Sequence, residues 1–301
     1  MSKLLARVGI PALAILAFAG CGSSNNSTTS STASNVKPGT NTIDATIAGQ
    51  VPSAIKSKGT LTVASEAQYA PNEFIAPDGH TIVGMDADLT KALGEVTGLK
   101  VKLVNSNFET IIPGLAAGRY DLGASSFTDT KEREKTVDFV DYFNAGISFY
   151  AKATANPGVT GLSDLCGKTV AVEKGTVEQE ESQAQSKKCA KEAKKGVNVL
   201  TYPGQDAVNL AISSGRAEVG LADSPVVAYQ IKQANGQFKI VGKTYAFAPY
   251  GLAIPRSSGM TKPIAAALQK LIENGTYTRI LEKWGLLAGA ISTPKINGAT
   301  S

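Results

Sequence analysis

Histidine and cysteine are scarce in this 301-residue chain, which contains one histidine and three cysteines. A site for a soft transition metal needs three or four such ligands close together. The sequence therefore excludes a zinc site of that kind, and we expect no metal and no cofactor. His80 itself lies in the turn sequence Asp78-Gly79-His80, and we expect it at the surface.

Phosphate-binding loops and basic patches are also missing. Neither G-x-x-x-x-G-K-[ST] nor G-x-G-x-x-G occurs, which argues against a nucleotide site. The formal net charge is +5, and it falls to +3 when Lys3 and Arg7 of the N-terminal segment are left out. This charge is mild, and no basic stretch is interleaved with aromatic residues, so we expect no nucleic-acid partner.

The one long apolar run lies at the N-terminus. Lys3 and Arg7 precede apolar residues 8–19, a run that is too short to span a bilayer and is typical of an export signal. The segment ends in Phe18-Ala19-Gly20-Cys21, which resembles the lipobox of bacterial lipoproteins. We expect a signal peptide over 1–20 and a lipid on Cys21 as the only membrane anchor. The alternative is an ordinary secretion signal with an incidental cysteine.

Serine, threonine and asparagine dominate the start of the next segment, 21–54, which has no aromatic residue and almost no charge. Such a segment buries too little apolar surface to offset its ordering entropy, so we expect a flexible tether. The remaining body of about 245 residues is large for one domain and comfortable for two lobes. An exported protein sits in an oxidising compartment, which favours a Cys166–Cys189 disulfide over the alternative of two buried thiols.

Strand and helix patterns alternate along the body and occur twice in the same order. The first unit has expected strands over 60–64, 101–104 and 120–124, and helices over 86–97 and 108–117. The second has strands over 168–172, 197–202 and 218–222, and helices over 177–189 and 206–214. A strand over 250–254 and helices over 262–274 and 277–284 follow. This order predicts α/β units with parallel sheets and right-handed crossovers.

Polar and aromatic residues follow the expected strands, at 65–69, 105–108, 125–128, 173–176 and 223–225. Ligands of open α/β sheets bind beyond the carboxyl ends of the strands. Hydroxyls, aromatic rings, carboxylates and a glycine turn at these ends predict a site for a small polar molecule.

A series of short motifs follows in a fixed order along Gly59–Gly285. They are Gly84-Met85-Asp86-Ala87-Asp88-Leu89, similar to G-F-D-x-D-L; IPGLAAGRYD at 112–121; 128–133 with 137–139; 165–168; Gly175-Thr176; 214–216 ahead of 222–225; and 275–277 with 283–285. Together they resemble the extracellular solute-binding proteins of polar amino acid ABC importers, bacterial family 3. The resemblance implies a two-lobed type II periplasmic-binding-protein fold. In this fold each lobe is a mainly parallel sheet flanked by helices, and the ligand lies in the cleft between the lobes.

Two chain crossings between the lobes follow from this resemblance. We expect them near 147–151 and 245–248. Lobe 1 would then comprise 55–148 plus 248–291, lobe 2 would comprise 149–247, and 292–301 would be a C-terminal tail.

The resemblance also assigns ligand-binding roles. Arg133 matches the arginine that holds the α-carboxylate, with backbone donors at Thr128, Thr176 and Val177. Without the resemblance, the charged run 131–135 favours a surface helix residue at Arg133, and the family match reverses this interpretation. Asp223 matches the aspartate that binds the α-ammonium, although its place before Pro225 also suits a helix N-cap.

Further residues complete the implied site. Ser125 assists Asp223, Tyr69 and Phe108 sandwich the aliphatic part of the ligand, and Ser126 and Phe127 complete their loop. Glu66 and Glu173 lie beside the ligand side chain, and two carboxylates favour a cationic one. The best prediction is therefore arginine, lysine or ornithine. An uncharged polar or acidic amino acid such as glutamine or glutamate stays open, because Lys174 would suit it if it pointed inward.

The predicted function is capture of a polar amino acid outside the cell and delivery to the membrane subunits of an ABC importer by hinge closure. We expect a monomer that is not an enzyme. The rival from another class is a dehydratase-like enzyme on the same fold, in which Glu66 or Glu173 would supply the acid or base.

Overall fold

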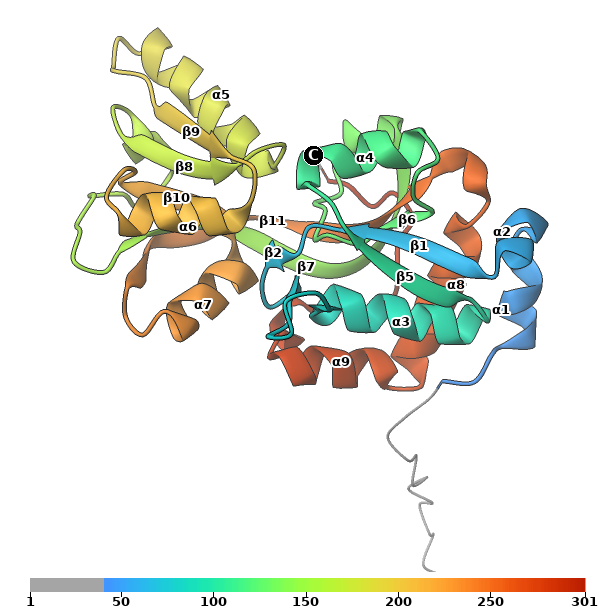
Figure 1. Ribbon diagram of the computed structural model, residues 1–301. Helices are drawn as coiled ribbons and strands as arrows, with labels where there is room; N and C mark the ends of the chain where they lie inside the picture. The colour runs from blue at the N-terminus through green and yellow to red at the C-terminus, as the bar shows by residue number, and fades with distance from the viewer. Residues whose placement is uncertain (1–40, 301) are drawn as a thin grey trace, which may run out of the picture. The chain divides into compact units, whose positions relative to one another are not determined.

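The computed structural model describes residues 41–300, which belong to one compact unit. The predicted signal peptide, Cys21 and the start of the tether lie outside the described residues. No helix within 41–300 is both long and apolar enough to cross a membrane. The described strands form an eight-stranded sheet in the order β5-β1-β6-β11-β7-β10-β8-β9 and a separate three-stranded sheet (Figure 1).

Lobe 1 is built on β1 (Thr60–Ser65), which pairs in parallel with β5 (Lys100–Asn105) and β6 (Leu122–Gly123). One face of this sheet packs on α3 (Met85–Thr97), α8 (Thr261–Glu273) and α9 (Thr276–Trp284), and the other on α4 (Phe108–Ala116). Helix α3 buries Leu89 and Leu93 at helical spacing and ends at Gly98, whose φ of 75° is the left-handed conformation that glycine allows.

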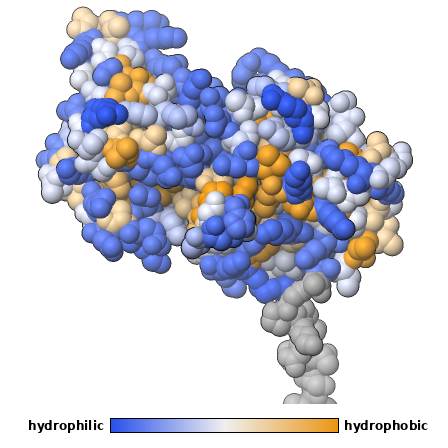
Figure 2. All heavy atoms as spheres, viewed as in Figure 1, coloured by the Kyte–Doolittle hydropathy of each residue, from blue (hydrophilic) through white to orange (hydrophobic). Residues whose placement is uncertain are grey.

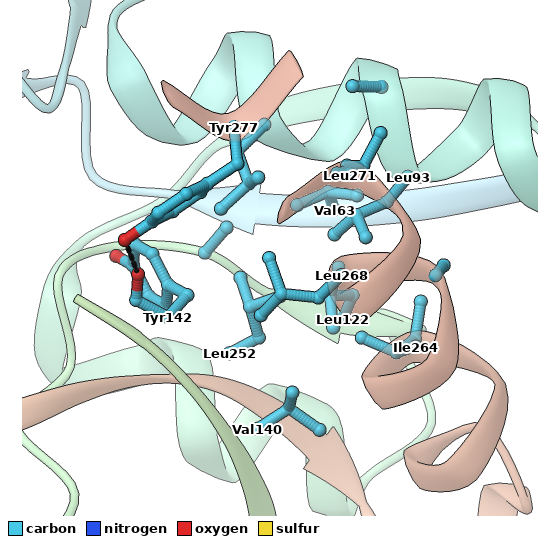
Figure 3. Packing of buried hydrophobic residues seen from close by; sticks show 14 of the residues in the cluster. Val63, Leu93, Leu122, Val140, Tyr142, Leu252, Ile264, Leu268, Leu271 and Tyr277 are labelled. Carbon is cyan, nitrogen blue, oxygen red and sulfur yellow. Dashed lines mark hydrogen bonds between the residues drawn. The ribbon is translucent and has the colours of Figure 1, made fainter. Parts of the chain in front are cut away.

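The larger core of lobe 1 joins these helices to the sheet. Figure 3 shows Val63 and Leu122 from the strands against Ile264, Leu268 and Leu271 from α8. The tyrosine hydroxyls among these residues have partners, because that of Tyr277 donates to the backbone carbonyl of Tyr142 at 2.7 Å and that of Tyr142 donates to Asp86. Most of the face in Figure 2 is hydrophilic, and its apolar residues form small separate groups.

Lobe 2 repeats the arrangement around β8 (Thr169–Glu173), which pairs in parallel with β9 (Asn198–Tyr202) and β10 (Val219–Asp223). Helix α5 (Val177–Lys191) covers one face, and α6 (Gln205–Ser213) and α7 (Ser224–Gln233) cover the other. A disulfide joins Cys166 to Cys189 with a Cα–Cα distance of 5.6 Å, which confirms the predicted pairing and removes the alternative of two thiols.

Two long antiparallel strands, β7 (Val137–Lys152) and β11 (Phe238–Pro255), connect the lobes. From the sequence, only residues 250–254 of these two strands were predicted, because neither strand shows a clean alternation of apolar and polar residues. On β7, Ala145 packs in the core of lobe 1 and Ile147 packs in the core of lobe 2. On β11, Tyr245 packs against the core of lobe 2 and Tyr250 packs in the core of lobe 1. The register of the pair is irregular between Tyr245 and Ala248, where Ala246 has a φ of 49°. The exact lobe limits stay a prediction.

The end of the predicted tether needs correction. Helices α1 (Ala45–Gln50) and α2 (Ser53–Lys58) occupy the end of the predicted tether, and Ile47 and Val51 are buried in the core of lobe 1. Asp44 caps α1 by accepting from the amides of Thr46 and Ile47. Folded structure therefore begins before residue 54, because two apolar side chains of this polar segment are buried in the core of lobe 1.

The C-terminal tail packs along the free edge of β7 in lobe 1. The Asp141 amide donates to the Lys295 carbonyl at 2.8 Å, and the Asn297 amide donates to the Phe139 carbonyl at 3.1 Å. The tail thus acts as a short extra strand that covers an otherwise unpaired sheet edge, and it belongs structurally to lobe 1.

A small antiparallel sheet lies between α3 and the cavity described below. It consists of β2 (Gln68–Tyr69), β3 (Glu73–Ile75) and β4 (Ile82–Val83). The sequence analysis did not predict it, because its strands have only two or three residues. Four short 3₁₀ segments complete the structure: Arg133–Lys135, Leu162–Leu165, Arg256–Ser258 and Leu287–Gly289.

Candidate functional site

The carboxyl ends of the parallel strands in both lobes meet at one cavity of about 290 Å³. Eleven of the twelve residues predicted as ligand contacts line it, and Phe127 does not. Glu73 and Glu178 also line it and were not predicted. The full lining is Glu66, Tyr69, Glu73, Phe108, Ser125, Ser126, Thr128, Arg133, Glu173, Thr176, Val177, Glu178 and Asp223.

Arg133 points into this cavity and not to the surface. Its guanidinium donates to the Thr128 carbonyl at 2.8 Å and, across the cleft, to the Gly175 carbonyl at 3.0 Å. It lies over the rings of Phe108 and Phe127, 5.5 and 5.8 Å from their centroids. Burial lowers the pKa of Arg133, and nearby carboxylates oppose that shift. A planar cation held this way suits a carboxylate.

Phe127 lies behind the cavity wall. Its ring stacks on that of Phe108 with centroids 4.6 Å apart, and its side chain is fully buried. Phe127 therefore supports Phe108 and Arg133 and does not face the cavity. The sequence could not separate the two roles, because both aromatic residues follow strands of the same sheet.

Asp223 and Tyr69 join the two lobes at the other side of the cavity. The Tyr69 hydroxyl donates to Oδ2 of Asp223 at 2.8 Å and accepts from the Asp223 amide at 3.1 Å. Although Asp223 precedes α7, its side chain makes no capping bond to that helix. The carboxylate instead faces the cavity, and burial raises its pKa to about 6.

Serine and threonine donors complete the polar lining. The loop after β6 is fixed by the Ser126 amide, which donates to Oδ2 of Asp86 at 3.0 Å, while Ser126 has a φ of 50°. Ser125 Oγ accepts from the Glu66 amide at 2.9 Å. In lobe 2, Thr176 caps α5, so the first turn of that helix, with Val177, brings free amides to the cavity.

Acidic side chains dominate the lining. Five carboxyl groups surround the cavity with Arg133 as its single basic side chain. Burial raises the pKa of Glu66 to about 8 and holds the pKa values of Glu73, Glu173 and Glu178 well above their usual range. Oε1 of Glu173 and Oε1 of Glu178 are buried without a hydrogen-bond partner. Such a set is electrostatically suited to a ligand with more than one positive charge.

Glu73 and Glu178 were not predicted from the sequence, for different reasons. Glu73 lies on the small β2–β4 sheet, where its carboxylate accepts from the hydroxyls of Ser125 and Ser126 at 3.3 and 3.2 Å. No pattern in the sequence marks it. Glu178 is the second residue of α5 and is almost fully buried. Extending the strand-end rule by two residues would have included it.

No group of three histidine, cysteine, aspartate or glutamate side chains within 41–300 has the arrangement of a metal site. The lining combines an anion-binding part, made by Arg133 and the start of α5, with a larger cation-binding part made by carboxylates. This is the donor and acceptor pattern of an amino acid.

Comparison with known proteins agrees with this chemistry. Residues 61–287 match the family model of bacterial extracellular solute-binding proteins, family 3. The chain is 37% identical to an arginine-binding protein, ArgT, of Corynebacterium glutamicum over 252 residues, which are 83% of this chain and 82% of that relative.

Solved structures give the same result. An ancestral arginine-binding protein bound to arginine matches with a TM-score of 0.68 and 37% identity, over 75% of this chain and 98% of that one. An ancestral amino acid-binding protein described as a precursor of cyclohexadienyl dehydratase matches with a TM-score of 0.66 and 32% identity, over 77% and 97%. The chain belongs to the bacterial extracellular solute-binding proteins of family 3, with their two-lobed fold.

Proposed function

We propose that this protein captures a cationic amino acid, arginine foremost, and delivers it to the membrane subunits of its importer as a lipid-anchored monomer. The observation that carries the proposal is the ratio of five carboxyl groups to one guanidinium around a single cavity. A zwitterionic amino acid with a neutral side chain adds no net charge to this excess. A cationic side chain adds one positive charge, and buried carboxylates without a counter-ion are costly.

Each end of such a ligand has a matching group. The α-carboxylate pairs with Arg133 and the amides at the start of α5, and the α-ammonium pairs with Asp223. The side chain then extends toward Glu66, which directly follows β1 in lobe 1, and Glu173, the last residue of β8 in lobe 2. The arginine-binding names of the Corynebacterium relative and of the ancestral structure support this choice.

Delivery depends on a change that the importer recognises. Because the cavity is lined by both lobes, a bound amino acid stabilises the state in which they are closed, by its differential affinity for that state. The irregular pairing of β7 and β11 near Tyr245 is the place where we expect the hinge.

Calorimetric titration with arginine, lysine, glutamine and glutamate tests the ligand class. We expect arginine or lysine to bind at least about tenfold more tightly than glutamine, a difference of about 1.4 kcal/mol. Tight binding of glutamate with no response to arginine or lysine would refute the proposal. For the anchor, mass spectrometry of the exported protein should show a diacylglyceryl group on Cys21, and an unmodified mature N-terminus would exclude it.

A dehydratase is the second candidate, because one structural relative is described as the precursor of such an enzyme. Glu173 is buried, and its raised pKa suits a general acid. The absorbance change on incubation with a cyclohexadienyl amino acid measures turnover. We expect none, and a steady turnover that Glu173→Gln abolishes would establish the enzyme instead.

A further inference from the structure

Glu109 contacts the opposite lobe at the acidic end of the cavity. It is the second residue of α4, directly after the cavity-lining Phe108. Its Oε1 lies 3.3 Å from Nζ of Lys174, which follows the cavity-lining Glu173 in lobe 2. One ion pair therefore joins the chain neighbours of two lining residues across the cleft.

Close packing fixes the same contact. Gly175 has a φ of 82°, and a Cβ placed on it would lie 2.8 Å from Cβ of Glu109. The Gly175 carbonyl also accepts from Arg133 at 3.0 Å. The turn that carries Glu173 and Lys174 is thus held against Glu109 from two directions, which fixes where the Glu109 carboxylate lies.

The second oxygen of this carboxylate has no partner. Oε2 of Glu109 and Oε1 of Glu173 are both buried without a hydrogen bond. Burial raises the pKa values of Glu66 and Glu173, and the nearby charge of Glu109 raises both further. None of the ion pairs within 41–300 includes Glu66 or Glu173. Two buried carboxyl oxygens without a partner, with a third carboxyl group nearby, are costly to ionise unless a cation lies among them.

We propose that Glu109 is a specificity-determining residue, whose free Oε2 accepts a hydrogen bond from the distal cation of the ligand side chain. Lys174 is the positioning residue, because it holds the other oxygen and leaves Oε2 available. A guanidinium presents five N–H groups in one plane and can bond to several carboxylates at once, whereas an ammonium presents three on one atom. The site therefore favours a guanidinium over an uncharged group of the same shape. This inference rests on the proposed binding of a cationic amino acid.

Arginine and citrulline provide the test, because citrulline has the same length and an uncharged ureido group. Calorimetry gives both dissociation constants for the wild type, for Glu109→Gln and for the control Glu132→Gln. Glu132 is also an acid in an ion pair, with Lys135. Neither Glu109 nor Glu132 is among the lining residues, but the Glu132 side chain is largely exposed, whereas Oε2 of Glu109 is buried without a partner. We expect Glu109→Gln to weaken arginine binding about tenfold or more and citrulline binding less than about threefold, and Glu132→Gln to change neither.

Circular dichroism establishes that each variant is folded. If Glu109→Gln does not fold, Glu109→Asp takes its place, because the shorter carboxylate keeps its charge and withdraws from the cavity; the same selective loss of arginine affinity is expected. Equal losses for arginine and citrulline, or no loss, overturn the role of Glu109 while the proposed function stands. A wild-type protein that does not bind arginine overturns both.

Discussion

At the scale of single residues, the site depends on charges that are buried together and therefore control one another. Arg133 is the only basic side chain of the cavity lining, and five carboxyl groups surround it. Its guanidinium is fixed by two backbone carbonyls and lies over two aromatic rings. Such preorganisation lowers the entropy that binding would otherwise lose.

Arg133→Ala should abolish amino acid binding while the protein stays folded. The ligand carboxylate would be left in a buried site without its cation, a penalty of about 3–5 kcal/mol. Calorimetry measures the binding and circular dichroism the fold. Arg256→Ala is a suitable control, because Arg256 is an exposed arginine of lobe 1 that does not line the cavity. Binding by Arg133→Ala within a few-fold of the wild type would contradict its role.

The raised pKa of Glu66 predicts a pH dependence of stability. Its ordinary value is 4.5, and burial raises it to about 8 in the folded protein. Between these values the folded state holds a proton that the unfolded state has released, so the free energy of unfolding falls as pH rises. The contribution of the protonated group is complete below about pH 4.5 and is lost as pH rises through about 8.

Denaturant titrations of the ligand-free protein at several pH values between about 5 and 8 measure this effect. Glu66→Gln should flatten the decline, since the amide does not titrate. An equal decline in the wild type and in Glu66→Gln would assign the pH dependence to the other buried carboxyl groups.

At the scale of elements, short segments that look dispensable in the sequence complete the core of lobe 1. Helix α1 contributes Ile47 to that core, and the C-terminal tail covers the edge of β7. Under the tail lie Asp129 and Asp141, both buried. Burial raises their pKa values to about 6 and about 8. The tail therefore covers these two carboxyl groups as well as a sheet edge.

Gly298→Ala tests how tightly the tail is docked. A Cβ at this position would lie 2.1 Å from Oδ2 of Asp141, so the tail or the carboxylate must move. We expect the free energy of unfolding to fall by about 1–3 kcal/mol. Gly161→Ala is the matched control, because no atom lies within 4 Å of the added methyl group. Equal stabilities of the two variants would show that the tail yields without loss.

At the scale of the whole molecule, three contacts hold the lobes together around the cavity. They are the hydrogen bonds between Tyr69 and Asp223, the bond from Arg133 to Gly175, and the ion pair of Lys174 with Glu109. All three involve residues that line the cavity or lie next to lining residues. The same groups therefore bind the ligand and hold the lobes closed, so an importer that recognises the closed state also recognises the bound ligand.

Ligand binding should stabilise the entire folded unit. Arginine at 100 times its dissociation constant should add about 2.7 kcal/mol to the free energy of unfolding. Differential scanning fluorimetry with and without arginine measures the accompanying rise in melting temperature. The Arg133→Ala protein provides the control and should show no shift. A similar shift in both proteins would place arginine at a different site.

Sequence by itself determined the parts that follow from local pattern. Helical periodicity predicted α3 and α8 to within a few residues, because each buries one stripe of apolar side chains. Helix α5 was also predicted to within a few residues, although the residues it buries are mostly polar. The ends of parallel strands predicted most of the cavity lining, since all these ends meet at one edge of a sheet. The two remaining cysteines of an exported chain predicted the disulfide.

Only the tertiary structure decided which groups meet across the cleft. Glu73 faces the cavity because a hairpin of very short strands turns it there, and Phe127 faces away because Phe108 takes its place. The long strands β7 and β11, the docked tail and the Lys174–Glu109 pair depend on partners about 65 to 160 residues away along the chain. No local pattern encodes such distant pairings, because they form only when burial of the two cores brings those segments together.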